Sequence, residues 1–141
     1  MPHYTVVHAT PSVTTYQALR IGAGLSPKST EAATRGLPAT LFAVQVLCDG
    51  VAVGMGRVIG DGGCFYQVVD IGVLKAHQGQ GLGKTIMNEI KAYLDREAPP
   101  GAYVSLIADG RANELYAQYG FAPTAPASIG MAYVVSAARA A

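Results

Sequence analysis

The glycine-rich run Gln78-Gly79-Gln80-Gly81-Leu82-Gly83 is the feature that most limits how this chain can fold. It follows a strand-like run, residues 66–74, and leads into a helix-like run, residues 82–96. Glycines at a strand-to-helix turn let the backbone approach a ligand without interference from a Cβ atom. The first N–H groups of a helix are unpaired and carry roughly half a positive charge, so they can hold a phosphate. The sequence predicts a site for a phosphorylated ligand here, and a tight turn without a ligand is the alternative.

An antiparallel meander is expected before this run. Asp49-Gly50 lies between two strand-like runs, residues 41–48 and 51–59, and this dipeptide is the strongest short signal for a hairpin. A second turn at Gly60-Asp61-Gly62-Gly63 leads into a strand from Phe65 to Leu74. Three consecutive strands are therefore predicted to pair side by side.

The remaining elements complete an α+β pattern. Ser12 is predicted to cap a first helix, residues 13–23, and Ser26 is predicted to cap a second, with Pro27 at its first position. The other predicted elements are strands at 4–9, 102–108, from Phe121 and at 130–135, and a helix at 112–119. The run 102–108 is apolar at both parities, which predicts burial on both faces.

These elements predict one domain over residues 1–141. The order β-α-α-β-β-β-α-β-α-β-β predicts a mixed central sheet of about seven strands with helices on both faces. A chain of 141 residues is long enough for one such two-layer core.

Composition excludes several classes of partner. Only 13% of the residues are charged and the net charge is +1, so neither disorder nor nucleic-acid binding is expected. No apolar run approaches the roughly 20 residues of a membrane span, and residues 1–10 show no signal-peptide pattern. Cys48 and Cys64 lack metal-ligand spacing and are expected to be buried free thiols, which indicates a reducing, cytoplasmic location and no metal site.

Two nucleotide-binding motifs fail on spacing. Gly83-Lys84-Thr85 matches the end of a Walker phosphate loop, but Gly79 lies one position too close to be its first glycine. The dinucleotide fingerprint requires a different glycine spacing near a first β-α-β unit. The meander that precedes the run suits neither fold.

Two separated motifs resemble those of the GCN5-related N-acetyltransferases. Gln78, Gly81 and Gly83 fill that family's Gln/Arg-x-x-Gly-x-Gly/Ala signature, and Tyr116 with Gly120-Phe121 matches a later one. The resemblance covers most of the chain and is tightest from Gly54 to Phe121. The run 56–63, Asp70 and Gly130-Met131 look like a small single-domain subgroup similar to arylalkylamine and glucosamine-phosphate acetyltransferases.

The resemblance implies acetyl-CoA as acetyl donor. Backbone N–H groups of the loop would hold the pyrophosphate, and the residues implied are Gln78, Gly79, Gln80, Gly81, Leu82, Gly83 and Lys84. The fourth strand would splay from the fifth, so that Ile71, Gly72 and Val73 pair with the pantetheine arm. A backbone N–H near Val73 would polarise the thioester carbonyl. Lys84 either adds a charge near the phosphates or is an ordinary solvated helix residue.

Tyr116 and Asp70 are the catalytic candidates. Tyr116 matches the family's general acid, which protonates the leaving thiolate. A phenol with a pKa of about 10 can give its proton to a thiolate whose thiol has a pKa of about 8.5. The alternative role for Tyr116 is that of a core tyrosine. Asp70 stands in an otherwise apolar run, where it could accept the amine's proton, bind the ammonium or pair with Arg57. Asp109 replaces an Asn that many members carry.

The function expected is N-acetylation of a small primary amine, either an arylalkylamine or an amino sugar. Direct transfer in a ternary complex is predicted because no cysteine lies near the loop. The acceptor pocket is expected between residues 25–37 and the strand around Tyr66 and Asp70. A non-catalytic CoA-binding module and a protein N-terminal or lysine acetyltransferase are the alternatives. The apolar run 130–135 could pair across a homodimer.

Overall fold

A computed structural model describes residues 3–136 of the chain. The chain divides into two compact units, Met1–Leu106 and Ile107–Ala141. The first unit contains the whole sheet and most of the helices, and the second contains one short helix. One domain over residues 1–141 stays a prediction.

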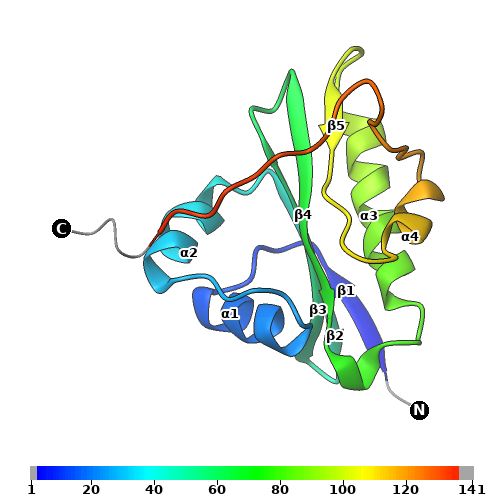
Figure 1. Ribbon diagram of the computed structural model, residues 1–141. Coiled ribbons are helices and arrows are strands. Elements are labelled where there is room, and N and C mark those ends of the chain that lie inside the picture. The colour runs from blue at the N-terminus through cyan, green and yellow to red at the C-terminus, as the bar shows by residue number, and fades with distance from the viewer. Residues whose placement is uncertain (1–2, 137–141) are drawn as a thin grey trace. The chain divides into compact units, whose positions relative to one another are not determined.

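A five-stranded mixed sheet forms the centre of the first unit (Figure 1). Neighbouring strands are antiparallel from β1 to β4, and β5 is parallel to β4 at the edge. The strands are β1 (Tyr4–Val7), β2 (Phe42–Cys48), β3 (Val51–Gly60), β4 (Phe65–Val73) and β5 (Tyr103–Ser105). The predicted meander is confirmed. Asp49 and Gly50 join β2 to β3 with φ angles of 49° and 85°, the left-handed pair that a type I′ hairpin requires.

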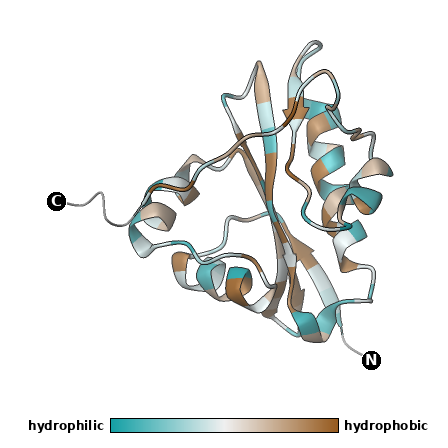
Figure 2. Ribbon diagram, viewed as in Figure 1, coloured by the Kyte–Doolittle hydropathy of each residue, from teal (hydrophilic) through white to brown (hydrophobic). Residues whose placement is uncertain are grey.

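Helices cover both faces of this sheet, as predicted. The helices α1 (Val13–Gly22) and α2 (Thr30–Gly36) lie on one face, and α3 (Leu82–Glu97) lies on the other (Figure 1). Two short 3-10 helices, η1 (Leu37–Ala39) and η2 (Lys75–His77), precede β2 and the glycine-rich loop. Apolar and polar residues alternate around α1 and α3, as expected of helices with one face against a sheet (Figure 2).

The helix caps confirm one prediction and correct another. The Ser12 hydroxyl accepts a hydrogen bond from the Thr15 N–H at 3.2 Å, which starts α1 as expected. The second helix starts after Ser29, not Ser26, because the Ser29 hydroxyl accepts from the Ala32 N–H at 3.1 Å. The Ser26 hydroxyl is instead occupied by Arg20, which donates to it at 3.0 Å.

The second unit corrects the predicted strand count. Its helix is α4 (Asn113–Ala117), and the described residues after it contain no strand. The strands predicted from Phe121 and at 130–135 are therefore absent, and the sheet has five strands instead of seven. The apolar residues of 130–135 favour a strand, but no described strand pairs with them; β propensity depends on such a neighbour.

The strand predicted at 102–108 is also shorter and less buried than expected. It pairs with β4 over Tyr103–Ser105 alone, and the Tyr103 residue is 52% exposed. An edge position with one neighbouring strand leaves this short strand open to solvent on its free side.

The central strand β3 carries the core of the first unit on both of its faces. Met55 packs with Tyr16 and Leu19 on the face of α1. On the opposite face stand Gly54 and Gly56, where α3 crosses. A Cβ atom added to Gly56 would lie 2.6 Å from Ile86 and 2.9 Å from Ile90, both fully buried residues of α3. Glycine at this position therefore sets how closely α3 approaches the sheet.

We expect Gly56→Ala to destabilise the protein by about 1–3 kcal/mol, because the new methyl group has no space between β3 and α3. Urea unfolding followed by circular dichroism measures the change. The matched control is Gly36→Ala, where an added Cβ meets no atom within 4 Å. Equal midpoints for the two variants would contradict the close approach of α3.

Candidate active site

The strand β4 pairs with β5 only at its first three residues. The two strands pair from Phe65–Gln67 against Tyr103–Ser105, and no described strand continues the pairing on that side of β4. Ile71, Gly72 and Val73 lie in the stretch without a β5 partner, and Gly72 and Val73 pair with β3 on their other side. An extended ligand can add to such an open strand edge through main-chain hydrogen bonds. The pairing with β5 thus ends before these residues, and the splay expected between the fourth and fifth strands stays a prediction.

A β-bulge in β4 aims the side chain of Asp70. Met55 pairs with Gly72 and Arg57 pairs with Val69, so β4 has one residue more than β3 between these pairs. Asp70 has a φ of 60°, the left-handed conformation that a bulge of this kind uses. Cross-strand partners share a face, so simple alternation from Val69 would turn Asp70 away from Arg57. The bulge instead brings both onto the same face.

The Asp70 carboxylate is held by three donors. One oxygen accepts from the Tyr16 hydroxyl at 3.0 Å and from Arg20 Nη1 at 2.5 Å, and the other accepts from Arg57 Nη1 at 2.9 Å. The three charged side chains are only 5–10% exposed. The Arg57 guanidinium also lies 5.6 Å from the centre of the Tyr16 ring. We call Tyr16, Arg20, Arg57 and Asp70 the Asp70 cluster.

Two further contacts fix the arginines of this cluster. Arg20 Nε donates to the Ser26 carbonyl at 2.6 Å, which ties the segment between α1 and α2 to the cluster. Arg57 Nε donates to the Thr40 hydroxyl at 3.0 Å. Among the described residues no buried side-chain nitrogen or oxygen lacks a partner.

The pairing of Asp70 with Arg57, one of its predicted roles, is confirmed. Its roles as proton acceptor or ammonium anchor stay predictions. Sequence reasoning missed Tyr16 and Arg20, although they stand four residues apart on the buried face of one helix. An arginine on that apolar face was the available signal. Burial raises the pKa of the Tyr16 phenol, and the nearby Asp70 charge raises it further, so Tyr16 remains a proton donor at neutral pH.

The glycine-rich loop has the backbone that a phosphate site needs. Gly79 and Gly81 both have a φ of 79°, so L side chains would be strained there. Gly81 precedes α3 without a side-chain cap, and the first turn of the helix contains no acidic residue. The Gln78 side chain donates to the Val73 carbonyl at 3.0 Å, which joins the loop to the open end of β4.

Most of the predicted donor-site residues lie on one continuous segment of the chain. Strand edge, loop and helix N-terminus follow one another from Ile71 to Lys84. Lys84 is exposed on the first turn of α3. The structure thus brings the predicted pantetheine and pyrophosphate residues together, while their binding roles stay predictions.

Tyr116 lies in the second unit. It is buried on α4, and its ring meets that of Phe121 edge-on with centroids 6.4 Å apart. Burial raises the pKa of its phenol, and the negative charge of Asp109 raises it further. The phenol is therefore protonated at neutral pH, as a general acid must be.

Neither cysteine is buried as predicted. Both are free thiols, but Cys64 is exposed in the turn before β4 and Cys48 is half-buried beside the hairpin. A turn position for Cys64 and a strand-end position for Cys48 leave little cover for either side chain. Within residues 3–136 no three His, Cys, Asp or Glu side chains gather as a metal site would need, and none of the helices is long and apolar enough to cross a membrane. A cytoplasmic location stays a prediction.

Comparison with known proteins identifies the class of protein that this fold and loop define. Residues 40–123, more than half of the chain, match the family model of the acetyltransferase (GNAT) domain. A protein of unknown function from meticillin-resistant Staphylococcus aureus, described as a probable acetyltransferase, is 48% identical. Its structure superposes with a TM-score of 0.90 over 94% of this chain and 100% of that one. No curated protein matches the chain.

More distant structures share the fold alone. Glucosamine-6-phosphate N-acetyltransferase from Arabidopsis thaliana is 14% identical, with a TM-score of 0.69 over 95% of this chain and 99% of its own. The ribosomal-protein-S18-alanine N-acetyltransferase from Escherichia coli is 19% identical, with a TM-score of 0.70 over 86% and 79%.

The chain belongs to the GCN5-related N-acetyltransferase family, and it is an acetyltransferase. The resemblance inferred from its two motifs is confirmed. Members of this family normally use acetyl-CoA.

We expect Asp70→Asn to lower the free energy of unfolding by about 3–5 kcal/mol, because it leaves two buried guanidinium groups without their carboxylate. Thermal and urea unfolding measure the loss. The matched control is Asp95→Asn, which removes an exposed partner of Lys91 and should change stability by about 0.5 kcal/mol or less. If both variants were equally stable, the Asp70 cluster would not be holding α1 to the sheet.

Proposed function

We propose that this acetyltransferase transfers the acetyl group of acetyl-CoA directly to a small primary amine. The observation that carries the proposal is the open edge of β4, which leads through the short helix η2 into the glycine-rich loop and the N-terminus of α3. This order suits a long ligand with an extended amide-bearing arm at one end and a pyrophosphate at the other.

The donor is assigned residue by residue. The backbone of Ile71, Gly72 and Val73 pairs with the pantetheine arm, and an N–H near Val73 polarises the thioester carbonyl. The N–H groups of residues 79–84 hold the pyrophosphate, whose charge is favoured by the uncapped start of α3. Gln78 supports this path by bonding the Val73 carbonyl.

Tyr116 is proposed as the general acid. The amine nitrogen attacks the thioester carbon, the carbon–sulfur bond breaks, and the phenol gives its proton to the departing thiolate. The nitrogen loses a proton as the amide forms, and solvent carries this proton back to the Tyr116 phenolate. The ammonium form of the acceptor must first lose a proton, for which Asp70 or solvent is the acceptor in this scheme. The raised pKa of Tyr116 keeps its proton in place at neutral pH.

The acceptor pocket is proposed on the face of α1 and α2, beside Asp70. An arylalkylamine and an amino sugar are the two acceptor classes in this proposal. A protein N-terminus or lysine is the second enzymatic candidate, and a CoA-binding module without activity is the candidate from another class. A homodimer is also proposed, supported by apolar side chains at Met131, Tyr133 and Val134 that are 84–89% exposed.

We expect Tyr116→Phe to lower kcat by about a hundredfold to ten-thousandfold, because the leaving thiolate loses its proton donor. Acetyl-CoA affinity, measured by calorimetry, should stay within about twofold since the ring is retained. Thiol release with a panel of amines, amino sugars and peptides measures kcat. The control is Tyr103→Phe on β5. Unchanged turnover in Tyr116→Phe would remove this residue from the mechanism, and absence of turnover in the native protein would support the CoA-binding module.

We expect CoA to raise the unfolding temperature and pantetheine, which lacks the pyrophosphate, to have little effect at the same concentration. The reason is that the loop and the N-terminus of α3 supply the anion site. Differential scanning fluorimetry makes the comparison at 0.05 and 0.5 M NaCl, and salt should weaken the CoA effect. Equal stabilisation by both ligands would show that the loop does not hold the pyrophosphate.

A further inference from the structure

We propose that the acceptor carries an anionic group, a carboxylate or a phosphate, and that Arg57 binds it. This inference rests on the proposed function, because it names the chemistry of the amine that occupies the acceptor side. It comes from the charge balance of the Asp70 cluster and from the hydrogen bonds that its two arginines make.

The Asp70 cluster has an excess of one positive charge. Two guanidinium groups share the single carboxylate of Asp70, and the ion pairs of Arg20 and Arg57 among the described residues are with that carboxylate alone. Their side chains are 10% and 8% exposed. A charge removed from water this far is costly unless another charge or several hydrogen bonds compensate for it. A bound anion would supply the missing charge.

The two arginines differ in which parts of the fold they contact. Arg20 donates from all three nitrogens, to Asp70 and to both the carbonyl and the hydroxyl of Ser26. Arg57 donates from Nε to Thr40 and from Nη1 to Asp70, and it also donates a hydrogen bond to the Tyr16 hydroxyl. A guanidinium group carries five N–H donors, so these bonds do not use all the donors of either arginine. Arg57 stands on β3, the strand that pairs with β4, and is therefore the arginine beside the open strand edge.

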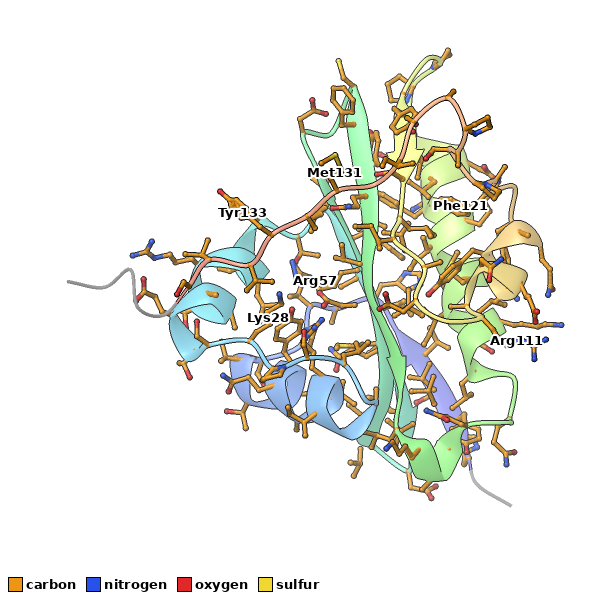
Figure 3. All side chains as sticks on the ribbon, in the orientation of Figure 1. Lys28, Arg57, Arg111, Phe121, Met131 and Tyr133 are labelled. Carbon is orange, nitrogen blue, oxygen red and sulfur yellow. The ribbon has the colours of Figure 1, made fainter. Side chains whose placement is uncertain are left out.

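The surroundings of Arg57 favour an anion over a cation. Figure 3 shows Arg57 and Lys28 on the same side of the sheet, the side of α1 and α2. Glu31 of α2 pairs with Arg35 of the same helix at 2.9 Å. Asp70, the carboxylate nearest to Arg57, already accepts three hydrogen bonds. An acceptor with a second ammonium group would meet positive charge here.

The position also suits an acceptor whose amine faces the thioester. Asp70 immediately precedes Ile71, the first residue of the open strand edge, and Arg57 is bonded to Asp70. A primary amine with its anionic group a few bonds away could place the nitrogen at the open end of β4 and the anion at Arg57. A guanidinium group recognises carboxylate and phosphate oxygens with directed, charge-assisted hydrogen bonds.

The experiment uses amines matched except for the anion. In the carboxylate arm, phenylalanine is compared with phenylalaninamide; in the phosphate arm, glucosamine 6-phosphate is compared with glucosamine. Thiol release gives kcat/KM, and thermal unfolding in saturating CoA gives binding without turnover. In at least one arm, we expect the anionic member to have a kcat/KM about tenfold to a hundredfold higher than its neutral counterpart.

The variants Arg57→Gln and Arg57→Lys test whether Arg57 binds the anionic group. The control is Arg96→Gln, on the exposed side of α3. We expect Arg57→Gln to reduce the preference for the anionic member to about twofold or less. The readout is the ratio of the two kcat/KM values, because a general loss of activity from the disturbed Asp70 cluster lowers both and cancels in the ratio. Arg57→Lys keeps the charge if Arg57→Gln does not fold, and it should reduce the preference partly because the planar fork is lost.

The outcomes separate this inference from the proposed function. Turnover of neutral and anionic amines at equal rates, or an anion preference that survives both Arg57 variants, overturns the inference and leaves the acetyltransferase proposal standing. Absence of thiol release with every amine overturns the small-amine proposal. In that case, Arg57-dependent stabilisation by the anionic member alone supports the anion site, and equal stabilisation by both members overturns it.

Discussion

The contact between the Asp70 carboxylate and the two guanidinium groups is the interaction on which the face of the sheet toward α1 depends. It joins three elements that are distant in sequence, because Arg20 comes from α1, Arg57 from β3 and Asp70 from β4. Arg20 extends the connection to Ser26, and thereby to the segment leading to α2. Separating any of these groups would leave a buried charge without its partner, a cost of several kcal/mol. The geometry of this face is therefore fixed by charge as well as by apolar packing.

The bulge at Asp70 allows one strand to serve two purposes. Before it, β4 pairs with both neighbours; after it, the side toward β5 has no described strand partner. The bulge turns Asp70 toward α1, while Ile71 points to the other face, where its methyl group lies near the Gly56 backbone. Strand and loop then lead to α3, whose position depends on Gly54 and Gly56. The proposed donor path and the charged cluster are thus built from adjacent residues, and a change in the bulge would move both.

Local signals predicted most of the first unit. Asp49-Gly50, the glycines of the loop and the spacing of Ile86 and Ile90 each specify a structure within a few residues. The prediction of strands after α4 was wrong because a strand requires a neighbouring strand to pair with, and no local sequence pattern provides one. The prediction of Ser26 as a helix cap was wrong because its hydroxyl accepts a hydrogen bond from Arg20. Arg20 in turn contacts Asp70, which lies 50 residues away in the sequence and so outside any local pattern. The motifs thus predicted the loop, whereas the partners of Asp70 depended on the three-dimensional fold.

The two sides of the proposed site recognise their ligands by different means. In the proposed function, acetyl-CoA is held by N–H groups of β4, the loop and α3. Such backbone contacts tolerate many side chains at these positions, provided that the glycines remain. The proposed acceptor side consists of side chains, among which Arg20 and Arg57 carry one more charge than Asp70 balances. Two structures that share this fold are named as N-acetyltransferases of an amino sugar phosphate and of a protein alanine. In the function proposed for this chain, selectivity for the acceptor comes from side chains such as Arg57, because the two guanidinium groups of the Asp70 cluster exceed what its one carboxylate balances.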